Sequence, residues 1–103
     1  MALLTDELRA RLPPLYSQEA APDPYVYARF TLPGTTWSWY VIEGEARDGD
    51  YLFFGFVCGQ DSEFGYFLLS ELESVQTRLG ARVEQDPTFA EGRLTDSVPA
   101  PET

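Results

Sequence analysis

Residues 50–58 read Asp-Tyr-Leu-Phe-Phe-Gly-Phe-Val-Cys, and this stretch is apolar at nearly every position. A short run rich in aromatic residues is typical of a β-strand, because flat rings pack well on a pleated surface. Side chains alternate between the two faces of a strand. Both faces here are apolar, with Tyr51, Phe53 and Val57 on one and Leu52, Phe54, Phe56 and Cys58 on the other. The stretch therefore predicts a sheet that needs cover on both faces.

Further strand patterns flank this stretch on both sides. We predict strands over residues 25–32, 35–43 and 63–69, which are rich in aromatic and β-branched residues. Pro33 and Gly34 fit the central positions of a type II turn, because Pro fixes φ and Gly accepts a positive φ. The short loops between consecutive strands indicate an antiparallel meander.

Two helix patterns lie outside these strands. Residues 5–12 predict a short helix with Thr5 as its N-cap and Pro13 as its stop. Ser70-Glu71-Leu72-Glu73 matches a capping box, with Ser70 as the N-cap and Glu73 at the third helical position. This second helix is predicted to bury Leu72, Val75 and Leu79 and to end before Gly80. Residues 82–84 predict a short edge strand.

Together these patterns predict an α+β fold: an antiparallel meander of about four strands, a short N-terminal helix and one helix after the last main strand. We expect residues 1–94 to form one domain and residues 95–103 a disordered tail, with a linker at residues 17–24. Two short helices cover about one face of the sheet. Residues 13–24, residues 85–94, a second subunit or a ligand must cover the other.

The charge of the chain restricts its partners. Of the 103 residues, 17 are Asp or Glu and seven are Arg, with no Lys and no His, for a net charge of −10. This charge repels polyanions, so we expect no binding of nucleic acid. It favours a basic protein partner, and a homodimer through an apolar face of the sheet is the other partner considered.

Cysteine content and the N-terminus indicate the compartment. Cys58 is the single cysteine, which excludes an intramolecular disulfide, and its apolar neighbours predict a buried, unreactive thiol. The first seven residues already contain two acids, which is unlike a signal peptide. No apolar run is long enough to span a membrane. We therefore predict a cytoplasmic protein without a membrane association.

Few residues of the chain suit catalysis. Without His the chain lacks Ser-His and Cys-His pairs and most zinc sites. Glu43, Glu84 and Asp86 would form a carboxylate site for magnesium or for acid–base chemistry if they converged over the face of Trp37 and Trp39. Their spacing does not require this. We predict no catalytic residue, no metal and no cofactor, and keep a small carboxylate-dependent enzyme as an alternative.

Aromatic residues make up 15% of the chain and offer another alternative. Exposed rings can stack on the bases of single-stranded nucleic acid. The rings considered for such a platform are Trp37, Trp39, Tyr40, Phe54, Tyr66 and Phe67. Core packing accounts for the same rings, and the acidic chain lacks the positive groove that such platforms need.

Several short sequence motifs occur together along the chain. They are Leu12-Pro13-Pro14-Leu15-Tyr16, Asp23-Pro24, Phe30-Thr31 with Pro33, Trp37-Ser38-Trp39-Tyr40 with Glu43, Phe53-Phe54-Gly55, Gly65-Tyr66-Phe67 and Ser70-Glu71-Leu72-Glu73. Over residues 3–89 the chain resembles domain-of-unknown-function family 2958, whose members are short bacterial proteins often carried by plasmids and mobile elements. The family usually carries a Glu-Arg-Asp triplet near its end, where this chain has Glu84-Gln85-Asp86. The resemblance implies a fold and a cellular setting but no mechanism.

The sequence thus favours a non-catalytic interaction protein that binds a host or mobile-element protein and partly mimics the charge of nucleic acid. A metal-assisted enzyme and a nucleic-acid-binding module are the alternatives. The predicted binding residues are Trp37, Trp39, Tyr40, Glu43, Tyr66, Glu84 and Asp86.

Overall fold

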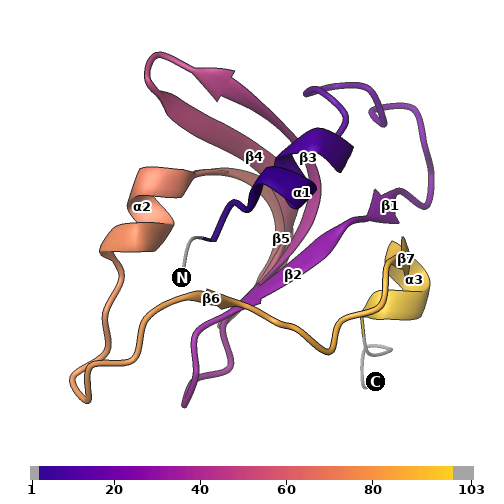
Figure 1. The fold of residues 1–103 in the computed structure, drawn as a ribbon. Coiled ribbons are helices and arrows are strands. Elements are labelled where there is room, and N and C mark those ends of the chain that lie inside the picture. Colours follow the sequence, from indigo (N-terminus) through magenta and orange to yellow (C-terminus); the bar gives the residue numbers. More distant parts are fainter. Residues whose placement is uncertain (1–2, 99–103) are drawn as a thin grey trace.

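A five-stranded antiparallel sheet in the order β5-β4-β3-β2-β6 forms the centre of the molecule (Figure 1). The computed structural model describes residues 3–98. The strands are β2 (Ala28–Thr31), β3 (Ser38–Arg47), β4 (Asp50–Cys58), β5 (Ser62–Leu68) and β6 (Glu84–Gln85). Strands β2 to β5 follow one another in sequence and in space, so the predicted antiparallel meander and the α+β class are confirmed.

The structure has more strands than the sequence predicted. The strand predicted over residues 25–32 is divided into β1 (Tyr25–Val26) and β2, with Tyr27 between them. Strand β1 leaves the main sheet and pairs with β7 (Gly92–Arg93) in a separate two-stranded sheet. The edge strand predicted over residues 82–84 lies further along the chain, since β6 is Glu84–Gln85 and pairs with β2 through Phe30 opposite Gln85 and Thr31 opposite Glu84.

The first helix and the first turn form as predicted. Helix α1 (Asp6–Arg11) begins after Thr5, whose Oγ1 accepts a hydrogen bond from the Leu8 amide at 3.1 Å. The turn after β2 places Gly34 at φ +81°, as the second central residue of a type II turn requires. The Thr35 amide closes this turn by donating to the Leu32 carbonyl at 3.2 Å.

The second helix differs from the prediction. Helix α2 spans Leu69–Ser74, and Leu68 rather than Ser70 occupies its N-cap position. The Glu71 carboxylate accepts the Leu68 amide at 3.0 Å, so it supplies one half of a capping box, whereas Ser70 donates to Asp50 on β4. The predicted continuation of the helix to residue 79 is absent, and Leu79 is 98% exposed instead of buried. Residues 76–82 form a tight turn instead, in which the amide of Thr77 donates to the carbonyl of Ala81 at 2.9 Å.

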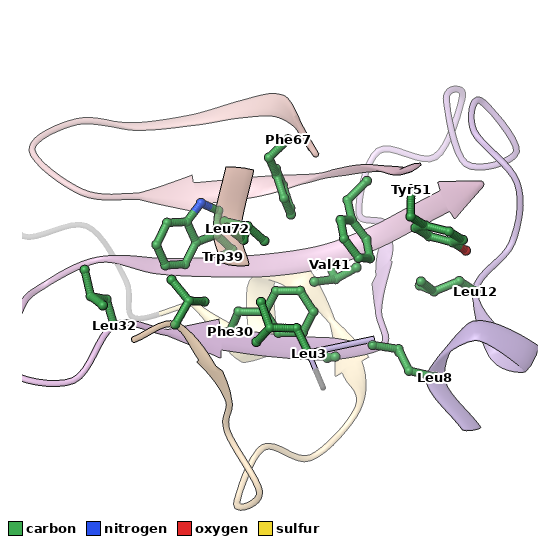
Figure 2. Packing of buried hydrophobic residues seen from close by; sticks show 13 residues of the cluster. Leu3, Leu8, Leu12, Phe30, Leu32, Trp39, Val41, Tyr51, Phe67 and Leu72 are labelled. Carbon is green, nitrogen blue, oxygen red and sulfur yellow. The ribbon is translucent and has the colours of Figure 1, made fainter. Parts of the chain in front are cut away.

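One face of the sheet packs under the helices, and we call it the helix face. Its buried strand residues include Phe30, Trp39, Val41, Phe53 and Phe67. Figure 2 shows the leucines of the N-terminal segment and Leu72 of α2 packed against this face. Phe30 and Phe53 are fully buried, with their rings in edge contact at 5.6 Å between centroids. The helix face is therefore a closed hydrophobic core.

Loop segments cover the opposite face, which we call the loop face. A second buried cluster there contains Val26, Tyr40, Ile42 and Leu94, with Phe54 and Phe56 partly buried beside it. Two of the covers predicted for this face are present, since residues 13–24 and 85–94 both contribute to it, and Val98 extends the second cover. Residues 17–24 are therefore more than a linker.

The C-terminal segment, with β7 and α3, lies beside β1 (Figure 1). Helix α3 (Leu94–Ser97) buries Leu94, and the Thr95 hydroxyl and amide both donate to the Asp23 carboxylate, at 2.7 and 3.0 Å. The predicted tail boundary at residue 95 therefore falls inside a helix that Asp23 holds through Thr95, while residues 99–103 lie outside the described residues. No helix in the described part of the chain is long and apolar enough to cross a membrane.

Candidate binding site

A β-bulge decides which face Glu43 occupies. Along β3 and β4, Val41 lies opposite Gly55 but Glu43 lies opposite Phe54, so Ile42 is an extra residue on β3. Residues directly opposite one another point to the same face of an antiparallel pair. The bulge therefore turns Glu43 onto the loop face beside Phe54, whereas simple alternation from Val41 would place it on the helix face.

Gly55 permits this bulge. A Cβ at Gly55 would lie 2.1 Å from the carbonyl oxygen of Tyr40, well inside van der Waals contact. Any side chain here would separate β4 from β3 at the bulge. Glycine is thus required at the position where the backbone of β3 comes closest.

The Glu43 side chain is only 3% exposed and organises residues 13–18. Its two carboxylate oxygens accept the amides of Tyr16 and Gln18, at 2.8 and 2.6 Å. Hydrogen bonds to a carboxylate are stronger than those to a neutral acceptor, so this charge holds the segment firmly. The Gln18 side chain extends the same network, since its amide nitrogen donates to the carbonyl of Ile42 at 3.2 Å.

Tyr16 is held in an unusual backbone conformation. Its φ is +72°, in the left-handed region that aromatic residues rarely adopt. Such strain persists only where surrounding contacts enforce it, and it concentrates at binding and catalytic sites. Here the bond from the Tyr16 amide to Glu43 enforces it, and the Tyr16 ring, 57% exposed, reaches the ring of Tyr66 at 6.5 Å between centroids.

A row of aromatic rings continues from Tyr16 across β5 and β4 on the loop face. Tyr66 lies 5.0 Å from Phe54, and Phe54 stacks on Phe64 at 5.8 Å with the ring planes 5° apart. Tyr66 is 52% exposed and Phe64 49% exposed. Rings of this size normally lie buried, so a row with three half-exposed members is a candidate recognition surface.

The row borders a hollow of about 370 Å³, which we call the aromatic hollow. Its main walls are Tyr16, Glu19, Glu43, Phe54, Phe64 and Tyr66. Both charged side chains in the lining of this hollow are acidic. The pKa of Tyr66 is raised, first by a side-chain hydrogen bond with Tyr16, then by partial desolvation and by the negative charges of nearby groups that include Glu43 and Glu19. The hollow therefore combines aromatic surface with a negative potential, which suits a cation.

A larger hollow of about 610 Å³ lies on the other side of the molecule, between α1 and β6. Arg11 there forms an ion pair with Glu91 and lies over the ring of Tyr27, so its charge and that ring already have partners. Gln85, which stands where the resembled family usually has Arg, lines this hollow, and its Oε1 is buried without a hydrogen-bond partner among the described residues. Without exposed aromatic rings, this hollow is the weaker candidate.

The three acids of the predicted carboxylate site have separate surroundings. Glu43 binds backbone amides, and Glu84 is exposed at the sheet edge opposite Thr31. Asp86 pairs with Arg29 at 2.9 Å, and its pKa is lowered first by hydrogen bonds from Thr88 and then by Arg29. Within residues 3–98 no group of three or more His, Cys, Asp and Glu side chains is placed to hold a metal ion.

The other predicted binding residues divide between the two faces. Trp39 is buried in the core of the helix face, and Tyr40 is buried on the loop face under Phe89. Trp37 lies outside β3, is 40% exposed and stacks on Trp39 at 6.0 Å. The rings considered for a nucleic-acid platform therefore do not form one surface. Of the seven predicted residues, Glu43 and Tyr66 meet in the aromatic hollow.

Two further observations change the sequence-based picture. Cys58 is partly exposed rather than buried, because it lies at the end of β4 where the sheet meets the turn over residues 59–61. Tyr16, Glu19 and Phe64 were not predicted as site residues. Phe64 and Tyr66 are two residues apart on β5. Because side chains of a strand repeat with a period of two, the sequence already predicted that both lie on the same face. Nothing in the sequence pattern indicated the conformation of Tyr16.

A family model described as a protein of unknown function, DUF2958, matches residues 3–98. This covers all of the described residues and extends past the resemblance over residues 3–89. The chain belongs to this family. No curated protein and no solved structure matches the chain. For this DUF2958 protein, any function must therefore be argued from its own surface.

Proposed function

We propose that this DUF2958 protein is a non-catalytic binding protein that takes a basic partner protein on its loop face. The observation that carries the proposal is the aromatic hollow, where half-exposed rings and the carboxylates of Glu19 and Glu43 line one cavity. Aromatic residues are enriched at protein interfaces and contribute much of their binding energy.

Charge decides which kind of partner fits. The net charge of −10 repels a second copy of the chain as well as a nucleic acid, and it draws in a basic surface. Proteins that bind DNA carry such surfaces. An acidic DUF2958 protein would then compete with DNA for its partner, in part as a charge mimic.

Photo-crosslinking tests the proposal directly. A benzophenone amino acid is placed at Phe64, on the rim of the hollow, and in a matched variant at Leu79, which is 98% exposed outside the hollow. Each variant is irradiated in bacterial lysate that has been treated with nuclease. We expect a discrete adduct with a basic protein from Phe64 and none from Leu79.

The two positions separate a specific interface from random contact. Both place the same photoreactive group in water, so their background labelling should be equal. Identical adducts from both positions, a cross-linked second copy of the chain, or an adduct that disappears with nuclease would each contradict the proposal.

A further inference from the structure

Four tyrosines of the chain share one arrangement: each has an arginine guanidinium over its ring. The pairs are Arg9 with Tyr51 at 5.2 Å, Arg11 with Tyr27 at 6.0 Å, Arg29 with Tyr40 at 5.6 Å and Arg93 with Tyr25 at 5.8 Å. A guanidinium is attracted to the electron-rich face of an aromatic ring and sheds water more readily than an ammonium group. The chain thus uses arginine repeatedly to cover tyrosine rings.

Tyr16 and Tyr66 are the two remaining tyrosines of the six, and they contact each other in the aromatic hollow. Within residues 3–98, no arginine lies over either ring at the distances seen in the other four pairs. Both are more than half exposed. The same hollow holds Glu19 and Glu43, so the two uncovered tyrosines lie beside two carboxylates.

We propose that the aromatic hollow binds an arginine side chain supplied by the partner protein. This inference rests on the proposed function and names the group that the loop face recognises. The guanidinium would lie against the rings of Tyr16 and Tyr66, as the four internal arginines lie against theirs.

Chemistry in the hollow favours arginine over lysine. A planar guanidinium stacks on rings while its edge donates to a carboxylate, and the hollow presents rings together with the exposed carboxylate of Glu19. Glu43, whose oxygens already accept the Tyr16 and Gln18 amides, adds its negative charge. The ammonium group of lysine is more strongly hydrated, so removing its water on entry into a partly desolvated site costs more free energy. The hollow of about 370 Å³ has room for a whole arginine side chain.

Titrations with three small probes test the inference. N-acetyl-arginine amide, N-acetyl-lysine amide and N-acetyl-citrulline amide are added to the isotope-labelled full chain at constant ionic strength, and NMR chemical shifts are followed. Citrulline has almost the shape of arginine without its charge. We expect saturable shifts at Tyr16, Phe64 and Tyr66 with the arginine probe, affinity weaker by at least about threefold with lysine, and no saturation with citrulline.

Matched variants locate the site. Tyr66→Ala should weaken arginine binding about three- to tenfold, since it removes one ring face. Trp37→Ala removes an exposed ring outside the hollow and should leave binding unchanged. Backbone amide spectra report whether each variant remains folded. If Tyr66→Ala does not fold, Phe64→Ala serves in its place.

The possible results separate this inference from the proposed function. Equal affinity for arginine and lysine, or binding that survives Tyr66→Ala, would overturn the assignment of an arginine site. Absent probe binding together with a specific adduct from Phe64 would overturn the arginine site and leave the basic-partner function in place. Absence of both the probe binding and the adduct would overturn both.

Discussion

The two faces of the sheet are closed by different means. On the helix face, leucines of α1 and α2 pack against rings such as Phe53, which is fully buried. On the loop face, polar bonds such as those from Tyr16 and Gln18 to Glu43 hold irregular segments in place, and rings such as Phe64 stay half exposed. The helix face therefore supplies most of the stability, and the loop face keeps the half-exposed rings on which the proposed binding depends.

The same substitution on the two faces should give the largest contrast. Phe53→Ala removes a fully buried ring and should lower the free energy of unfolding by about 3–5 kcal/mol. Phe64→Ala removes a ring that is 49% exposed and should cost less than about 1 kcal/mol. Urea unfolding of both variants measures the difference. Similar losses of unfolding free energy in the two variants would contradict the claim that the helix face supplies most of the stability.

Glu43→Ala tests how the loop face is held. It leaves the amides of Tyr16 and Gln18 without their acceptor, so we expect a loss of about 2–4 kcal/mol in unfolding free energy. Hydrogen exchange should speed up at those two amides. Glu45→Ala is the control, because Glu45 is more exposed and accepts one amide, from Leu15, at 3.1 Å. It should cost less than about 1 kcal/mol.

Tyr16 offers a sharper contrast between stability and binding. Because its φ is +72°, glycine suits the position better than alanine does. We expect Tyr16→Gly to be more stable than Tyr16→Ala by about 1 kcal/mol, the order found at left-handed positions. Both variants lose the ring and should bind the arginine probe more weakly. If alanine were the more stable, the strain assigned to Tyr16 would be absent.

Magnesium should have the smallest effect. The three acids Glu43, Glu84 and Asp86 have separate surroundings, so no closed cation site is expected to stabilise the folded state. Millimolar magnesium should raise the melting temperature no more than sodium chloride of equal ionic strength. A magnesium-specific rise that disappears in Glu43→Gln would revive the enzyme alternative.

Much of the fold was predictable because its signals are local. Thr5, Pro33 and Gly34 act through their own backbone preferences, and β4 was bounded correctly by its nearly continuous apolar run. The end of α2 was not predictable in this way. Leu79 continues the helical period of buried residues in the sequence. In the structure, a turn closed by the hydrogen bond from Thr77 to Ala81 forms in place of another helical turn. That competition depends on contacts within residues 76–82.

The candidate site was only half predictable, because it depends on register. Glu43 and Tyr66 were named from the sequence, but the bulge at Ile42 is what brings them to the same face. Gly55 was the one residue whose type indicated that bulge, but a glycine in a strand also occurs without a bulge. The bonds from Tyr16 and Gln18 join segments 25–27 residues apart, and no local pattern encodes them.

The affinity of a fluorescent peptide of alternating Gly and Arg, measured by anisotropy, tests the central claim most directly. Wild type is compared with the double variant Phe64→Ala/Tyr66→Ala and with Trp37→Ala. All three have the same net charge, so general attraction to the acidic chain cancels. We predict at least about tenfold weaker binding for the double variant at near-unchanged unfolding free energy, and no change for Trp37→Ala. Equal affinity in all three would show that the aromatic hollow is not the binding site.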